Sequence, residues 1–129
     1  MNNAEPLLAC TAMVQPETGE AVVDAFDIIR FWIIDTGCGH DMISKRMVAA
    51  FRDWLVNVQP MTFGTAGGAA DADLGLPMRI GPMNNQHATP YVMASTPALL
   101  SVGMRVVKFG YSFVWLPDRQ PCLITGRRW

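Results

Sequence analysis

Glycine and proline recur along this chain and leave little room for long regular elements. The 129 residues include eleven glycines and nine prolines, which divide the sequence into short segments. Proline interrupts helices and central strands, and glycine favours turns, so this punctuation is typical of short strands joined by tight turns. We therefore expect an all-β fold with one or two short helices, in a single domain spanning residues 1–129.

Apolar runs between these turns indicate where the elements lie. We expect a domain core over about residues 20–125, preceded by a short strand and followed by a loose C-terminal tail. In the first part of the chain we expect strands at Leu7–Val14, 21–29 and Phe31–Ile34, of which the last is buried, and then a short amphipathic helix over about Lys45–Trp54 with Ser44 as its N-cap. The middle part is expected to form a glycine-rich hairpin at 61–70 and interrupted strands over 71–94. The last part is expected to form a small strand at Ala98–Leu100, a helix from Val102 to Phe109 that ends at Gly110, and a hairpin of Tyr111–Trp115 with Cys122–Thr125.

The composition restricts the partners that this chain can have. Hydrophobic residues make up 50% and charged residues 16%, where about 25% charged is usual, so we expect a second chain to cover some apolar surface. A net charge of −1 gives no basic footprint for nucleic acid or an anionic membrane. The sequence has no run of the roughly 20 apolar residues that a membrane span needs, and no signal-peptide pattern at its start. We expect a cytoplasmic or particle-enclosed protein that is not secreted.

Cysteine and histidine give no sign of a metal or disulfide framework. The three cysteines, Cys10, Cys38 and Cys122, are odd in number and have no CxxC spacing. The two histidines, His40 and His87, add too few ligands for a structural zinc site. We expect no metal, no cofactor and a reducing compartment.

One acidic residue stands at a chemically unusual place. The apolar run Phe31–Ile34 ends at Asp35, which Thr36 and Gly37 follow. Glycine allows a sharp turn, the threonine hydroxyl can brace that turn, and an apolar wall beside a carboxyl raises its pKa. An aspartate that merely caps a turn at the end of a strand is the simpler interpretation of the same three residues.

Asp35 belongs to the first of three sequence blocks whose order is more specific than any one of them alone. They are WIIDTG at 32–37, TFGTAGG at 62–68 and ALLSVGMRVVKFGYSF at 98–113. In these blocks, over roughly residues 20–125, the sequence resembles the retroviral-type aspartic proteases (retropepsins), most closely the protease segment of Copia-type retrotransposon polyproteins. Three positions depart from the family pattern. Cys38 stands where alanine or serine is usual, and Ser101 where glycine is common. His40 lies near the triad but out of register with the histidine that Copia-type segments often carry there.

The resemblance implies a closed β-barrel of the acid-protease fold, active as a homodimer with a glycine-rich flap. It assigns the catalytic role to Asp35, Thr36 and Gly37, the substrate-binding flap to Phe63, Gly64, Thr65, Ala66, Gly67 and Gly68, and the active-site floor to Leu99, Leu100 and Ser101. Because peptide hydrolysis by carboxylates needs two that share a proton, a second copy of Asp35 would complete the site. The implied activity is an endopeptidase that matures a retroelement polyprotein, with an extended peptide as substrate.

Other interpretations stay open at this point. The chain could be a catalytically silent barrel that dimerises or binds peptides, although such a domain would not need the intact triad. Cys38 and His40 suggest a cysteine hydrolase, but they have no assured orienting acid. Asp71 and Asp73 are better explained as a solvated strand edge than as a cation site, and Asp41 as the cap of a turn.

Overall fold

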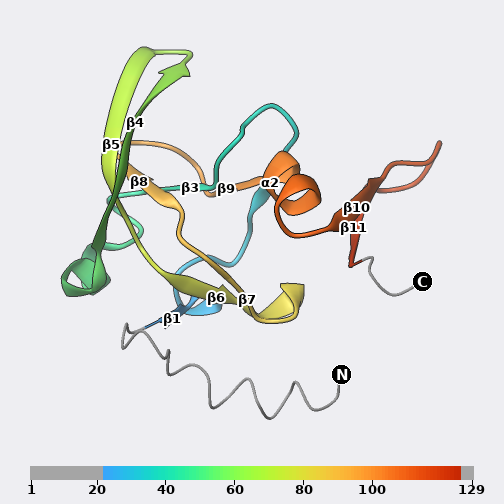
Figure 1. The fold of residues 1–129 in the computed structure, drawn as a ribbon, viewed down its shortest axis with the longest axis horizontal. Coiled ribbons are helices and arrows are strands. Elements are labelled where there is room, and N and C mark those ends of the chain that lie inside the picture. The colour runs from blue at the N-terminus through green and yellow to red at the C-terminus, as the bar shows by residue number, and fades with distance from the viewer. Residues whose placement is uncertain (1–21, 126–129) are drawn as a thin grey trace.

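The computed structural model describes residues 22–125, and most of its regular elements are short strands (Figure 1). The strand predicted at Leu7–Val14 and the tail at 126–129 lie outside these residues. In chain order the elements are β1 (Val23–Asp24), the 3₁₀ turn η1 (Ala25–Asp27), β2 (Ile33–Asp35), β3 (Met42–Ser44), the 3₁₀ segment η2 (Ala49–Trp54), β4 (Val56–Thr65), β5 (Gly68–Gly75), β6 (Met78–Ile80), the 3₁₀ turn η3 (Gly81–Met83), β7 (Gln86–Ala88), β8 (Tyr91–Met93), β9 (Leu99–Ser101), helix α2 (Val102–Val107), β10 (Tyr111–Val114) and β11 (Cys122–Thr125).

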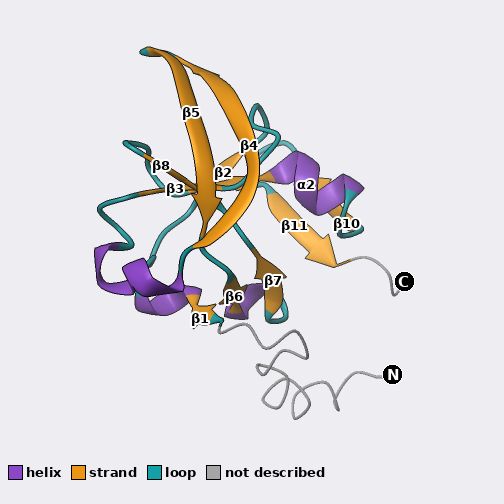
Figure 2. Ribbon diagram, turned by 60° about the vertical axis from the view of Figure 1, so that its left-hand side comes forward, coloured by secondary structure: helices purple, strands orange, loops and turns teal. Residues whose placement is uncertain are grey.

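These strands pair into three sheets. The largest has the order β2-β9-β3-β8-β5-β4, in which β2 and β9 run parallel, as do β3 and β8 (Figure 2). A second sheet has the order β1-β6-β7, and β10 pairs with β11 alone. The predicted all-β class with few short helices is therefore confirmed. The pairing within residues 22–125 leaves β2 and β4 at the edges of the largest sheet, so the closed barrel stays a prediction.

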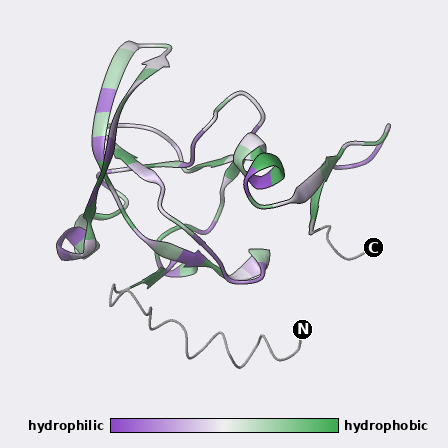
Figure 3. Ribbon diagram, in the orientation of Figure 1, coloured by the Kyte–Doolittle hydropathy of each residue, from purple (hydrophilic) through white to green (hydrophobic). Residues whose placement is uncertain are grey.

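The main core draws side chains from both larger sheets. Its buried members include Ile43 of β3, Leu76 just before β6, Met78 of β6 and Leu100 of β9. Burial of one such side chain contributes about 1.5–3 kcal/mol relative to exposure. A smaller cluster of Met42, Ala72 and Met93 lies under the β4–β5 hairpin. In Figure 3 helix α2 carries strong hydrophobic colour, whereas hydrophobic and hydrophilic colours alternate along the β4–β5 hairpin.

Two strand predictions near the N-terminal end need correction. The segment predicted as a strand over 21–29 forms the two-residue β1 and then a 3₁₀ turn, because the Asp24 carboxylate accepts the Phe26 amide and caps that turn at once. The strand predicted as buried at Phe31–Ile34 is β2, but Ile33 and Ile34 are half exposed. β2 is an edge strand that pairs with β9, so its apolar side chains are covered only in part by the described chain.

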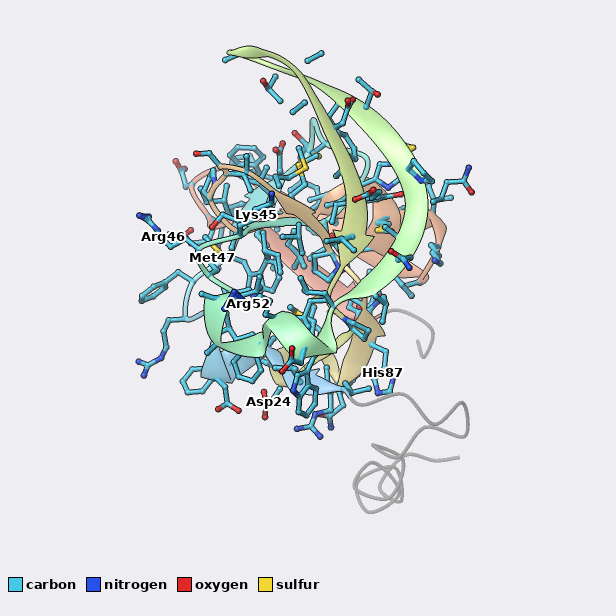
Figure 4. The ribbon with its side chains drawn as sticks, turned by 90° about the vertical axis from the view of Figure 1, so that its left-hand side faces the viewer. Asp24, Lys45, Arg46, Met47, Arg52 and His87 are labelled. Atoms are coloured by element: carbon cyan, nitrogen blue, oxygen red, sulfur yellow. The ribbon has the colours of Figure 1, made fainter. Side chains whose placement is uncertain are left out.

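The helix predicted over Lys45–Trp54 is also wrong in kind. Residues 45–48 form turns, and Ala49–Trp54 is a 3₁₀ segment interrupted at Phe51, whose φ is −119°. The Ser44 hydroxyl does accept the Met47 amide, at 3.4 Å, yet Val48 at the start of the 3₁₀ segment offers no side-chain cap. The segment is amphipathic nevertheless: Met47, Phe51 and Leu55 pack on the core. The exposed cations Lys45, Arg46 and Arg52 lie on this segment (Figure 4).

The C-terminal elements follow their sequence signals closely. Ser101 caps α2 by accepting the Met104 amide, and the turn after the helix uses Gly110 at φ +76°. The β10–β11 hairpin then projects from the body of the molecule (Figure 1). The Tyr111 hydroxyl anchors it by donating to the Met83 carbonyl at 3.1 Å. Burial raises the pKa of Tyr111, while the nearby Arg105 charge opposes that rise.

The β4–β5 hairpin is attached to the sheet at a crowded point. Gly75 of β5 pairs with Val56 of β4 and with Tyr91 of β8. A Cβ atom at position 75 would lie 2.8 Å from Thr89 Cγ2, 3.0 Å from Val58 Cγ1 and 3.1 Å from the Pro90 carbonyl oxygen. Only a glycine therefore lets three chain segments approach one another this closely.

This crowding makes the stability of the fold sensitive to a single methyl group. We predict that Gly75→Ala lowers the free energy of unfolding by about 1–3 kcal/mol, because backbone and side chains must shift to admit the Cβ atom. Urea unfolding followed by far-UV circular dichroism measures the difference. The matched control is Gly81→Ala, where a Cβ atom meets no atom within 4 Å. Equal stability of the two variants would contradict the close approach at Gly75.

Candidate active site

The Asp35 carboxylate lies where an exposed edge strand ends. β2 and β9 pair in parallel with Asp35 opposite Ser101, so the sheet fixes the backbone of the acid. Asp35 Oδ1 accepts the Gly37 amide at 2.7 Å, and a Cβ atom at position 37 would lie 3.4 Å from that same oxygen. Within the described residues Oδ2 has no hydrogen-bond partner, and Thr36 and Gly37 are exposed. The turn-capping interpretation accounts for one oxygen and leaves the other available to water.

The predicted floor residue Ser101 ties the Asp35 loop, which we define as residues 35–41, to the start of α2. The side chain is fully buried. Its hydroxyl donates to the Cys38 carbonyl at 2.7 Å and accepts the Met104 amide at 3.1 Å. A glycine at this position could make neither bond, so the serine adds a connection between loop and helix. Of the other floor residues, Leu100 belongs to the main core and Leu99 packs on the smaller cluster.

A buried ion pair that the sequence analysis did not identify holds the same loop. Asp41 Oδ2 lies 2.7 Å from Arg105 Nη2, and both side chains are almost completely buried. Asp41 Oδ1 also accepts the Ser101 amide at 2.8 Å. The prediction that Asp41 caps a turn is therefore wrong, because the carboxylate bonds to residues 60 and 64 positions away in the chain. The available signal was Arg105 itself, a cation within the otherwise apolar helix Val102–Val107.

Removing one charge of this pair leaves the other buried without compensation. We predict that Asp41→Asn costs about 3–5 kcal/mol of stability, since the asparagine amide group would face the Arg105 guanidinium. Chemical denaturation of the full chain provides the measurement. Asp24→Asn is the matched control: Asp24 pairs with Arg79 at 3.0 Å near the surface, where such pairs contribute about 0–1 kcal/mol. A loss at Asp41 no greater than at Asp24 would refute the role of the buried pair.

The glycine-rich hairpin predicted at 61–70 is confirmed as β4 and β5, although its strands extend further, to Val56 and Gly75. Its tip and the Asp35 loop point to the same side of the molecule in both ribbon views (Figures 1 and 2). Phe63 is half-buried, whereas Gly64, Thr65, Ala66, Gly67 and Gly68 are exposed. The tip is held by its own bonds: the Thr65 hydroxyl donates to the Gly68 carbonyl and accepts the Gly67 amide. No hydrogen bond within the described chain joins the tip to Asp35.

The alternative sites gain little from the geometry. The Cys38 thiol donates to the His40 carbonyl oxygen at 3.1 Å, while the His40 ring lies against Phe63 and Tyr91. Asp71 and Asp73 are exposed on β5 beside an open hollow of about 410 Å³, and Asp71 accepts the Thr62 hydroxyl. Over residues 22–125, no three His, Cys, Asp or Glu side chains are grouped so that they could hold a metal ion. None of the described helices is long and apolar enough to cross a membrane.

Several exposed apolar side chains lie on or just before β2, which carries the candidate catalytic acid, and on elements of the C-terminal part of the chain. They come from the approach to β2 and from β2 itself, from the last turn of α2, and from the end of β10 together with β11. We call these residues the β2–α2 surface: Phe31, Ile33, Ile34, Val106, Val107, Trp115, Leu116 and Ile124. Phe31 and Val107 are 88% and 86% exposed. The elements that carry the surface lie on one side of the molecule, opposite η2 (Figure 1). Concentrations of exposed apolar area of this kind mark interaction surfaces.

Comparison with protein-family models, with curated proteins and with solved structures finds no significant match to this chain.

Proposed function

We propose that this chain is a homodimeric aspartic endopeptidase of the retropepsin type, in which two copies of Asp35 form the catalytic dyad and which matures a retroelement polyprotein. The observation that carries the proposal is the Asp35 carboxylate, fixed at the end of an edge strand with one oxygen free and an exposed apolar surface beside it. The buried Asp41–Arg105 pair and Ser101 support it, because they hold the loop that carries this acid.

The proposed chemistry follows from two carboxylates brought close together. Like charges at short distance do not both ionise readily, so the dyad retains one shared proton at acidic to neutral pH. The ionised carboxylate takes a proton from a water molecule, which attacks the peptide carbonyl carbon. The protonated carboxyl gives its proton to the carbonyl oxygen, and a tetrahedral gem-diol forms. The carboxyl that took the water proton then protonates the peptide nitrogen, and the C–N bond breaks. The other carboxylate takes a proton from one hydroxyl of the gem-diol, which leaves a carboxylic acid, an amine and a dyad with one shared proton. The Gly37 amide, which already donates to Asp35 Oδ1, keeps the carboxylate oriented during these transfers.

In this proposal a second copy supplies the missing half of the site and covers the β2–α2 surface. One chain carries a single Asp35-Thr36-Gly37 sequence, and a twofold axis beside β2 would bring two such loops together. The acid-protease fold with a closed barrel belongs to the same proposal. The β4–β5 hairpin would act as the flap, closing over an extended peptide that lies above Leu99, Leu100 and Ser101.

The first test removes the proposed dyad without changing its shape. We predict that Asp35→Asn lowers kcat for peptide hydrolysis by about a hundredfold to ten-thousandfold, since neither amide can act as a general acid or base. Digestion of a mixed peptide library between pH 4 and 7, followed by mass spectrometry, is the measurement. The matched control is Asp53→Asn, at an exposed position on η2, which should cleave like the unchanged chain.

Two outcomes of this test would overturn the proposal. Equal cleavage by the Asp35→Asn variant would exclude the dyad. Peptide binding by the unchanged chain without any cleavage would instead favour the catalytically silent, peptide-binding module.

The second test addresses the β2–α2 surface. We predict that Val107→Glu weakens self-association by about tenfold or more, because a carboxylate would have to be buried in the contact between the copies. Analytical ultracentrifugation gives the dissociation constant, and circular dichroism should show an unchanged fold, since Val107 is 86% exposed in the single chain. Ala50→Glu adds the same charge on η2 and should associate normally. A strict monomer at micromolar concentration before any substitution would argue against the dimeric site.

A further inference from the structure

Three aromatic rings connect the Asp35 loop to the β4–β5 hairpin. His40 lies in the loop, Phe63 on β4 and Tyr91 on β8. The ring centroids of His40 and Phe63 are 5.6 Å apart, those of His40 and Tyr91 5.4 Å, and those of Phe63 and Tyr91 5.2 Å, all with edge-to-face geometry. Each ring therefore contacts the other two within the range that favours such pairs. We call this group the ring cluster.

The ring cluster rests on a buried apolar base. Phe63 and Tyr91 pack on the smaller core of Met42, Ala72 and Met93, so one side of the rings is shielded from water. Because Ala72 belongs to β5, both strands of the hairpin are fixed at this level. Displacing Phe63 would break two ring contacts and also expose apolar surface. Phe63 is therefore held more rigidly than it would be by strand pairing within the hairpin alone.

Tyr91 adds polar connections at the same level. Its hydroxyl donates to the Gln59 carbonyl at 2.9 Å, at the bulge where the register of β4 shifts. Its amide donates to the Asp41 carbonyl at 2.9 Å, and its backbone pairs with Gly75. This one residue therefore bonds to the Asp35 loop and to both strands of the hairpin. Beyond Phe63 the situation differs, because residues 64–69 are exposed and make only hydrogen bonds within the hairpin.

We infer that the ring cluster is the root of the hairpin: His40, Phe63 and Tyr91 couple it to the Asp35 loop, and only the segment beyond Phe63 moves freely. The inference rests on the proposed function solely where it treats the hairpin as a flap. The three residues are then positioning residues for peptide hydrolysis, which act by setting where the tip closes relative to Asp35. A hairpin with one anchored and one free end combines a defined closed position with an opening motion that needs no unfolding of the sheet.

The test measures coupling directly, without any need for activity. Hydrogen–deuterium exchange of the full chain, read by mass spectrometry, follows residues 56–75 and the loop 35–41 separately. We expect Phe63→Leu, which keeps an apolar side chain but loses both ring contacts, to speed exchange about tenfold to a hundredfold in both segments. Tyr91→Phe keeps the ring and loses only the Gln59 bond, so it should give a smaller increase in the same two segments.

The control variant lies on the free side of the root. Thr65→Val removes the two bonds of the Thr65 hydroxyl, and faster exchange should stay confined to the tip. A double-mutant cycle of His40→Ala with Phe63→Leu should be non-additive in the exchange of residues 35–41. Unchanged exchange of that loop in Phe63→Leu and Tyr91→Phe, or additivity in the cycle, would overturn the inference.

A kinetic readout separates this inference from the proposed function. If the chain cleaves peptides, Phe63→Leu should lower kcat/KM about tenfold. In the exchange experiment, Thr65→Val should leave the rate at the root unchanged. If the unchanged chain cleaves no peptide, the proposed function fails, whereas the exchange experiment still decides whether the ring cluster couples loop and hairpin. Coupling in exchange without any change in kcat/KM would confine the three residues to a structural role and overturn their assignment as positioning residues.

Discussion

The buried carboxylate of Asp41 is the interaction on which the rest of the site depends. It accepts the Ser101 amide with one oxygen and the Arg105 guanidinium with the other, so the loop after β2, the end of β9 and helix α2 meet at one side chain. Removing either charge would leave its partner buried without compensation, which costs more than the pair itself contributes. Asp35 belongs to the same loop, and its strand pairs with β9. The backbone that carries the candidate catalytic acid is therefore held both by the bonds of Asp41 and by the pairing of β2 with β9.

The β4–β5 hairpin depends on that frame in turn. At its base, Gly75 allows three segments to approach closely, and Pro60 lies where the register of β4 shifts, a place in which the missing amide costs no ladder bond. At its tip, Gly67 and Gly68 bring only turn geometry, and Gly68 adopts φ +113°. Glycine thus serves two opposite purposes in one hairpin, close packing at one end and a turn without anchoring side chains at the other.

Local signals explain which elements could be predicted from the sequence. The hairpin at 61–70, the strand before Ser101, the helix ending at Gly110 and the C-terminal hairpin all depend on turn residues and short apolar runs that act over a few positions. The prediction of a helix over Lys45–Trp54 was wrong because apolar spacing indicates only which residues are buried. A turn followed by a 3₁₀ segment buries the same residues. The Asp41–Arg105 pair and the ring cluster join distant segments, so no local pattern carries them.

The surplus of apolar residues and the single Asp35-Thr36-Gly37 sequence both bear on whether a second copy of the chain packs against this one. A chain that is 50% hydrophobic and 16% charged buries its two cores and still leaves β2, the end of α2 and the C-terminal hairpin uncovered. A two-stranded hairpin by itself is marginally stable in water, so β10 and β11 gain from any strand or surface packed against them. Peptide hydrolysis by carboxylates requires a second acid, and within residues 22–125 no hydrogen bond joins Asp35 to another carboxylate. One twofold contact along β2 would satisfy the packing and the chemistry together, which is why the proposal places the partner copy there.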